Sequence, residues 1–87
     1  MKKMLLIVNP LAGTRKTSRY LTDIISIFNR AGYQVSVYIT AAPGDGTREV
    51  AQRAGEVDLV VCAGGDGTFN ETISGLLQSG IDVPAGI

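Results

Sequence analysis

Short apolar runs alternate with amphipathic stretches along this chain of 87 residues, and no other feature constrains its fold as strongly. Residues 4–8 and 59–62 are continuous apolar runs typical of strands buried on both faces, and residues 35–39 alternate as strand residues do. Between these segments, apolar residues recur at the spacing of one helix face. The residues at this spacing are Leu21, Ile24, Ile25 and Phe28, then Val50, Ala51 and Ala54, then Phe69, Ile73, Leu76 and Leu77.

Turn-forming residues divide the chain into three strand–helix units, followed by the start of a fourth strand at residues 81–87. Such units form a parallel sheet, because right-handed crossovers pack the helices on its faces. The sequence therefore predicts the α/β class: one domain over residues 1–87, with a three-layer, Rossmann-like parallel sheet and helices on both faces. The expected helix caps and stops are Thr17, Gly32, Asp45 or Thr47, Gly55 and Gly80.

Composition excludes several kinds of function. Eight Lys and Arg balance eight Asp and Glu, which argues against a nucleic-acid-binding surface. The chain has no His, so it holds neither a Ser-His-Asp triad nor a histidine metal site. Cys62 is alone in an apolar run, which predicts a buried side chain and a reducing compartment. No apolar run approaches the ~20 residues of a membrane-spanning helix.

Ligands of open parallel sheets bind beyond the carboxyl ends of the strands, so the loops after Val8, Ile39 and Cys62 should share one edge. The third of these loops holds a glycine-rich turn, Ala-Gly-Gly-Asp-Gly-Thr at residues 63–68. Its glycines allow the backbone to come close to a bulky ligand, and the following helix presents unpaired N–H groups to an anion. The turn therefore predicts a site for a phosphate chain.

Polar side chains in and after this turn fit the same ligand. Asp66 beside phosphates requires Mg²⁺ or a hydroxyl proton between the two negative groups. Thr68 can cap the helix or contact a phosphate, and Glu71 suits the first helical turn. The alternative interpretation is a tight structural turn in which Asp66 or Thr68 is only a helix cap.

The first two loops carry weaker signals. Asn9 can present an amide donor and acceptor at the end of the first strand, and Gly13 relaxes the turn that follows. Residues 40–47 first indicate a turn, although a Thr40 hydroxyl on the shared edge could bind a nucleotide. A basic group at the start of the first helix fits either a nearby anionic ligand or a solvated surface. This group is Arg15, Lys16 and Arg19.

The glycine-rich turn carries a family resemblance. Residues 64–68, Gly-Gly-Asp-Gly-Thr, resemble the signature shared by diacylglycerol kinases, sphingosine kinases and NAD kinases, and by phosphofructokinases. The extension Phe69-Asn70-Glu71 makes the motif similar to that of the lipid-kinase branch. Motifs of the first two loops also match that branch, so the resemblance covers essentially the whole chain. These further matches are Asn9-Pro10 with Ala12-Gly13, and Thr40 with Gly44-Asp45.

The resemblance implies the nucleotide-binding lobe of a bacterial lipid kinase, which transfers the γ-phosphate of ATP to a lipid hydroxyl with Mg²⁺. It implies a catalytic role for Asp66 near the phosphates, either through Mg²⁺ or by orienting the acceptor hydroxyl. The residues that the resemblance implies for the ATP site are Asn9, Pro10, Leu11, Ala12, Gly13, Thr40, Gly64, Gly65, Asp66, Gly67, Thr68, Phe69, Asn70 and Glu71. The departures from the family pattern are small: Gly46 stands where the family often has Ala, and Leu11 lies at a variable position.

Members of this family continue into a second lobe that supplies lipid contacts and further catalytic groups. We therefore expect this chain to be a truncated lobe that is inactive alone and that dimerises or aggregates through an exposed apolar face. The resemblance further implies a cytoplasmic protein, peripheral to the inner face of the membrane, with a lipid acceptor, and the balanced charge predicts no nucleic-acid partner. Two alternatives are an NAD kinase fragment and a phosphate- or nucleotide-binding module without catalysis.

Overall fold

The structure is a computed structural model that describes residues 1–10 and 16–86. Its elements follow the predicted alternation of strand and helix. In chain order they are β1 (Lys2–Val8), α1 (Lys16–Arg30), β2 (Tyr33–Ile39), α2 (Asp45–Arg53), the 3₁₀ turn η1 (Ala54–Glu56), β3 (Leu59–Ala63), α3 (Asp66–Ser79) and β4 (Ala85–Gly86).

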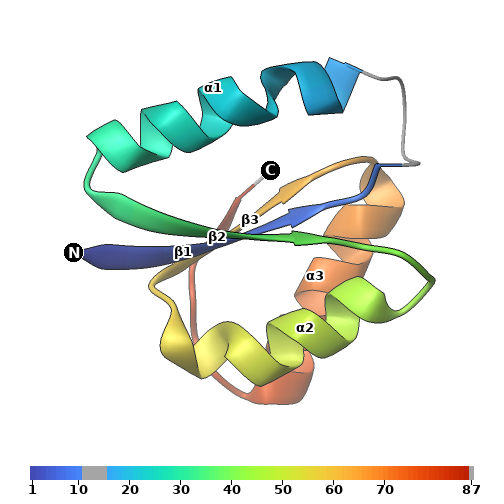
Figure 1. The fold of residues 1–87 in the computed structure, drawn as a ribbon. Coiled ribbons are helices and arrows are strands. Elements are labelled where there is room, and N and C mark those ends of the chain that lie inside the picture. Colours follow the sequence, from blue (N-terminus) through green and yellow to red (C-terminus); the bar gives the residue numbers. More distant parts are fainter. Residues whose placement is uncertain (11–15, 87) are drawn as a thin grey trace.

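The four strands form one parallel sheet in the order β2-β1-β3-β4. Figure 1 shows α1 on one face of the sheet and α2 and α3 on the other. Right-handed crossovers explain this division, because the chain moves one way from β1 to β2 and the opposite way from β2 through β3 to β4. The predicted three-layer α/β fold is confirmed.

β1 is the centre of the core, with residues 4–8 buried between its two neighbouring strands. Leu5 and Ile7 face α2 and α3 and pack with Val50 and Val60. On the opposite face, Met4, Leu6, Val8 and Val61 pack against apolar residues of α1. A central parallel strand needs apolar side chains at every position because both of its faces are covered.

A glycine allows α2 and α3 to pack closely on their shared face. A Cβ added at Gly75 of α3 would lie 2.6 Å from the backbone oxygen of Thr47 and 2.7 Å from the Val50 Cβ. Only a residue without a side chain fits at this crossing. The contact connects the helix after the glycine-rich turn to the helix after β2.

Several predicted helix ends differ from the observed ones. Gly32 and Gly80 follow their helices with φ of 94° and 68°, which confirms both as stops in the left-handed region. The first helix begins one residue before Thr17, and α2 begins at Asp45 after the left-handed Gly44, without a side-chain cap. α2 ends at Arg53, and the predicted stop Gly55 lies in η1.

The predicted fourth strand is much shorter than expected. Of residues 81–86, which the structure describes, Ala85 and Gly86 pair with Val60 and Val61, and residues 81–84 are irregular. Pro84 has no N–H to donate, although its carbonyl accepts a hydrogen bond from the Val60 N–H at 3.0 Å. Apolar composition alone therefore overestimated this strand.

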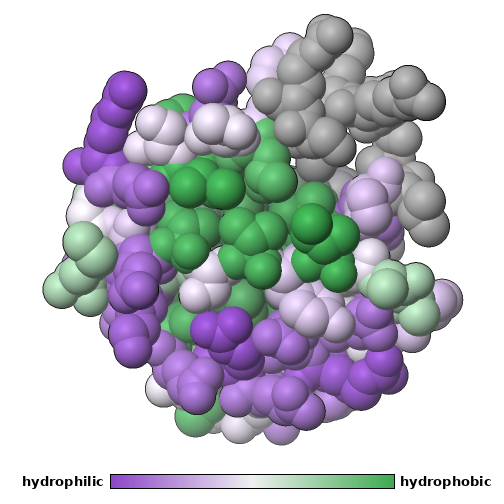
Figure 2. Space-filling view, in the orientation of Figure 1, coloured by the Kyte–Doolittle hydropathy of each residue, from purple (hydrophilic) through white to green (hydrophobic). Residues whose placement is uncertain are grey.

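Apolar side chains remain exposed around α1. In Figure 2 they gather in the middle of the view, below α1 and over the sheet edge formed by β2. Exposed apolar residues of these two elements are Ile27, Val37 and Ile39. Among the described residues, no helix has the length and apolar character to cross a membrane.

Candidate functional site

Backbone hydrogen bonds bring the carboxyl ends of three strands together, as predicted. The Asn9 N–H donates to the Ala63 oxygen at 3.1 Å, which ties the end of β1 to β3. The Thr40 N–H donates to the Val8 oxygen at 2.8 Å, and the Thr40 hydroxyl donates to the same oxygen at 3.4 Å. Because β1 and β3 lead to helices on opposite faces, their shared edge is the switch point at which open α/β sheets bind ligands.

The glycines of the glycine-rich turn have different local surroundings. A Cβ at Gly64 would lie 2.5 Å from the Thr68 hydroxyl oxygen and 3.4 Å from the Asn9 Cβ. Packing within the chain therefore excludes a side chain there. Gly65 and Gly67 are exposed, and a Cβ at either would meet no atom within 4 Å. These two glycines leave the backbone open on its outer side, where a ligand could approach.

The N-terminus of α3 lacks a side-chain cap. Its N-cap residue, Gly65, makes no side-chain hydrogen bond, and Asp66 is the first helical residue with an exposed side chain. Thr68 is 4% exposed, and its hydroxyl oxygen is buried without a hydrogen-bond partner in the described part of the chain. The expectation that Asp66 or Thr68 caps this helix is therefore wrong, because the N-cap residue is Gly65.

An uncapped helix N-terminus with a buried, unsatisfied hydroxyl can bind an anion. Free backbone N–H groups and the helix dipole favour negative charge, and a buried polar atom costs free energy until it gains a partner. Both features lie next to Gly64, at the edge shared with Asn9. A phosphate group fits this arrangement.

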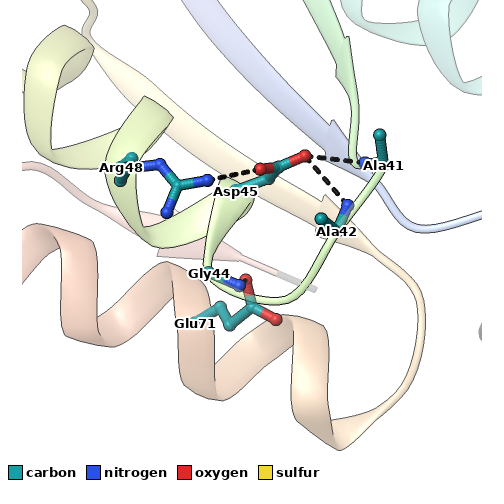
Figure 3. Close-up of polar contacts among 6 residues, drawn as sticks. All are labelled: Ala41, Ala42, Gly44, Asp45, Arg48 and Glu71. Atoms are coloured by element: carbon teal, nitrogen blue, oxygen red, sulfur yellow. Dashed lines mark hydrogen bonds and ion pairs between the residues drawn. The ribbon is translucent and has the colours of Figure 1, made fainter.

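An aspartate orders the loop between β2 and α2. The Asp45 carboxylate accepts hydrogen bonds from the N–H groups of Ala41 at 2.8 Å and Ala42 at 3.0 Å, and it pairs with Arg48 at 2.6 Å (Figure 3). The Ala41 hydrogen bond, with smaller contributions from Ala42 and Arg48, lowers the pKa of Asp45 below its ordinary value of 3.8. The carboxylate therefore stabilises the turn between β2 and α2, and it does not cap α2.

Glu71 joins the same loop to α3. Its side-chain oxygen Oε1 accepts a hydrogen bond from the Gly44 N–H at 3.2 Å, and its backbone oxygen accepts one from the Thr47 hydroxyl at 2.9 Å (Figure 3 shows the first contact). A Cβ at Gly46 would lie 3.3 Å from the same Oε1. Glu71 thus connects the loop after β2 with the helix after the glycine-rich turn.

A small cavity opens between these loops, and we name it the edge pocket. Its volume is about 170 Å³. Polar side chains line one part of its wall and small apolar side chains the rest, which suits a ligand with both kinds of surface. The lining residues are Asn9, Thr40, Ala41, Ala42, Pro43 and Glu71.

The structure brings together some of the predicted site residues. Asn9, Thr40 and Glu71 line the edge pocket, and Gly64 and Thr68 adjoin Asn9. Five others are exposed on the same edge or in the first turns of α3: Pro10, Gly65, Asp66, Gly67 and Asn70.

The remaining predicted residues lie elsewhere. Phe69 packs against the core beneath α2 and α3, so its side chain supports the turn from inside. Leu11, Ala12, Gly13 and Arg15 lie outside the described residues, as do the side chains of Lys16 and Arg19. Cys62 is buried as predicted, and burial raises the pKa of its thiol.

Sequence reasoning missed part of the edge pocket. Ala41, Ala42 and Pro43 carry no reactive group, so their residue types do not mark them as functional, and Asp45 holds its own loop although its position predicts a helix cap. The available signal was position, because a loop that follows the carboxyl end of a parallel strand lies at the ligand-binding edge.

The described residues fit a phosphate better than they fit a metal ion on its own. Within residues 1–10 and 16–86, no three Asp, Glu, Cys or His side chains lie close enough together to hold a metal. Asp66 supplies one exposed carboxylate beside the α3 N-terminus. Mg²⁺ commonly takes one or two protein carboxylates together with substrate phosphates, so a single carboxylate here fits only a metal that arrives with a phosphate ligand.

Comparison with known proteins agrees with this geometry. The profile of the diacylglycerol kinase catalytic domain family matches residues 3–87. The chain is 39% identical over 77 residues to a diacylglycerol kinase of Bacillus subtilis (strain 168), covering 87% of this chain and 25% of that protein. It is 41% identical over 75 residues to a diacylglycerol kinase of Staphylococcus haemolyticus (strain JCSC1435), covering 84% of this chain and 22% of that protein.

A solved structure of a diacylglycerol kinase from Bacillus anthracis str. Sterne has the same arrangement of elements. It superimposes with a TM-score of 0.79 at 34% identity, over 98% of this chain and 31% of that chain. This chain spans about a quarter of the length of the curated relatives described above. The chain belongs to the diacylglycerol kinase catalytic domain family.

Proposed function

We propose that this chain is the ATP-binding portion of a lipid kinase, which transfers the γ-phosphate of ATP to a lipid hydroxyl such as that of diacylglycerol. One observation carries the proposal. The buried, unpartnered hydroxyl of Thr68 lies at the uncapped N-terminus of α3, beside Gly64 and the switch point of the sheet. This is the arrangement that a phosphate chain would complete.

The neighbouring edge pocket is the reason to propose a nucleotide as the ligand and not a lone phosphate. The pocket has Asn9 and Glu71 as polar wall residues and Pro43 as an apolar one. A ligand with a phosphate chain at α3 and a base or sugar in the edge pocket would contact all three loops. Gly65 and Gly67 would let the phosphates approach the backbone.

Phosphoryl transfer depends mainly on positioning and on neutralising charge, and a bound Mg²⁺ supplies part of that neutralisation. In the proposal Asp66 is the catalytic residue of this chain, next to the phosphates, where it would hold the metal or orient the acceptor hydroxyl. Backbone N–H groups of α3 and the Thr68 hydroxyl would hold the phosphates.

This chain spans about a quarter of the length of its curated relatives, and the lipid acceptor would bind through the other part of the full-length protein. We therefore expect residues 1–87 alone to bind ATP without phosphorylating diacylglycerol. For the full-length protein we propose a cytoplasmic location with peripheral contact at the membrane, and a homodimer as its assembly.

The test compares single variants of the full-length protein in ATP titrations and in phosphorylation assays. A Cβ at Gly65 or Gly67 would meet no atom within 4 Å, so Gly65→Ala and Gly67→Ala should leave the protein folded and should weaken ATP binding. Alanine at position 67, inside α3, should not lower the thermal midpoint, because alanine favours a helix. Asp66→Asn should bind ATP and lose turnover. Phosphorylation of NAD in place of diacylglycerol, or ATP binding without transfer to any acceptor, would contradict the proposal and favour one of the two alternatives.

A further inference from the structure

Asp45 holds one wall of the edge pocket although it does not line the pocket itself. Its oxygen Oδ2 accepts hydrogen bonds from the N–H groups of Ala41 at 2.8 Å and Ala42 at 3.0 Å, and both of these residues line the pocket. In Figure 3 the carboxylate lies between these two N–H groups on one side and Arg48 on the other. Asp45 thus acts on the pocket through the backbone of its wall.

Residues 41–43 depend on Asp45 for their order. In the described part of the chain, every hydrogen bond of these three residues has Asp45 as its partner. The two N–H groups donate to its carboxylate, and the Ala42 oxygen accepts from its backbone N–H at 3.2 Å. Pro43 has no N–H to donate, and all three residues are exposed. A short exposed segment gains little from apolar burial, so without the carboxylate we expect it to sample several conformations.

The carboxylate is itself fixed in one orientation. Its second oxygen, Oδ1, pairs with Arg48 at 2.6 Å, and the Asp45 side chain is 12% exposed. A side chain whose own rotamer is fixed by a second contact holds its partner more precisely. Because peptide groups are planar, fixing the N–H groups of Ala41 and Ala42 also fixes the carbonyl groups of Thr40 and Ala41. The backbone of this wall is therefore ordered before any ligand binds.

We propose that Asp45 is a positioning residue for the nucleotide, which holds residues 41–43 as a preformed wall of the edge pocket. The inference rests on the proposed function, in which part of ATP occupies this pocket. A preformed wall lowers the cost of binding, because a mobile loop loses conformational entropy when a ligand orders it. The reacting phosphates lie at α3 in that function. Asp45 should therefore affect how tightly ATP binds and not how fast the bound phosphate is transferred.

Three variants of the full-length protein test this by ATP titration and by diacylglycerol phosphorylation. Asp45→Ala removes both oxygens and should raise the Kd and KM for ATP about tenfold, with kcat within about twofold of the parent value. Asp45→Asn retains one oxygen that can accept both N–H groups, so its KM should return to within about threefold of the parent value. Arg53→Gln is the control. It loses ion pairs with Glu49 at 3.6 Å and Glu56 at 3.3 Å at the other end of α2, and it should leave KM unchanged.

Hydrogen exchange of the Ala41 and Ala42 amides in the parent protein is a second measurement, which needs no variant to fold. A preformed wall requires both amides to be protected without ATP, and protection that appears only with ATP would overturn the inference. An unchanged KM in Asp45→Ala would also overturn it, as would a loss confined to kcat.

An Asp45→Asn protein as impaired as Asp45→Ala would overturn the inference too, because the ion pair with Arg48 would then matter in place of the two hydrogen bonds. These results differ from a failure of the proposed function. In that case the parent protein itself would neither bind ATP nor phosphorylate diacylglycerol, and both the function and the role of Asp45 would be overturned.

Discussion

The Glu71 carboxylate accepts a hydrogen bond from the Gly44 backbone N–H, with 3.2 Å between Oε1 and N. The two residues belong to different strand–helix units, so this bond fixes the loop after β2 relative to the glycine-rich turn. Gly44 has a φ of 89° and precedes α2, a position at which the chain turns sharply. The carboxylate therefore stabilises this turn and one wall of the edge pocket together.

Replacing Glu71 should separate the effect of this hydrogen bond from that of the negative charge. Glu71→Ala removes the acceptor and should cost about 1 kcal/mol of unfolding free energy, a typical value for one partly buried hydrogen bond. Glu71→Gln keeps an oxygen acceptor and should recover most of that loss. Urea unfolding and hydrogen exchange of the Gly44 amide, both without nucleotide, check this. Equal losses in both variants would show that the charge, and not the hydrogen bond, stabilises the loop.

Thr68→Val should stabilise the ligand-free protein. The hydroxyl of Thr68 is buried without a partner, so an apolar side chain of the same shape removes an unsatisfied polar group, at a gain of about 1 kcal/mol. The same variant should weaken ATP binding about tenfold, because the phosphate loses its hydroxyl partner. Thermal unfolding and ATP titration of the full-length protein measure the two effects.

Thr72→Val is the matched control for this change. Thr72 is one turn further along α3, and its hydroxyl already donates to the Thr68 backbone oxygen at 2.9 Å. The control should not gain stability and should bind ATP as the parent protein does. If Thr68→Val also failed to gain stability, the Thr68 hydroxyl would have a partner in solution and the argument for a phosphate would fail.

Gly75→Ala and Gly46→Ala should have opposite effects on the free energy of unfolding. Both glycines are buried in helices, but a Cβ at position 75 would lie 2.6 Å from the Thr47 backbone oxygen, whereas at position 46 its nearest contact is 3.3 Å from the Glu71 side chain. We expect Gly75→Ala to cost about 1–3 kcal/mol by forcing α2 and α3 apart. Gly46→Ala should be neutral or stabilising by up to about 1 kcal/mol, because alanine favours a helix. Chemical denaturation of the two variants decides this, and equal losses would contradict the described helix crossing.

Stability should fall in acid through Asp45. Its pKa is lowered in the folded state, first by the hydrogen bond from Ala41, so the ionised carboxylate stabilises the fold at pH values above its ordinary pKa of 3.8. That stabilisation is lost as the pH falls through the lower pKa of the folded state. Asp45→Asn should therefore be less stable than the parent near neutral pH, and the difference should shrink below about pH 4. Urea titrations across this range measure it, and a difference that persists at about pH 2 would contradict the prediction.

Much of the fold was predictable because local patterns and global packing agree. The apolar run at residues 4–8 is a fully buried central strand, and Gly32 and Gly80 stop their helices with positive φ, as their positions indicated. Residues 81–87 show the opposite case. Their apolar composition predicted a strand, but among the described residues 81–86 pairing is limited to Ala85 and Gly86, because pairing depends on the neighbouring strand as well as on composition.

The candidate site also has features that the sequence predicts and features that only the tertiary structure shows. By itself, the sequence determined the α/β class, the shared edge of three loops and the family, since strand and helix periodicity, glycine spacing and motif order are local properties of the chain. Only the tertiary structure showed that Gly64 accommodates the Thr68 hydroxyl, that Asp45 holds its own loop, and that Glu71 reaches Gly44. These contacts join residues whose distances and burial depend on how the helices pack across the sheet, and no local pattern encodes that packing.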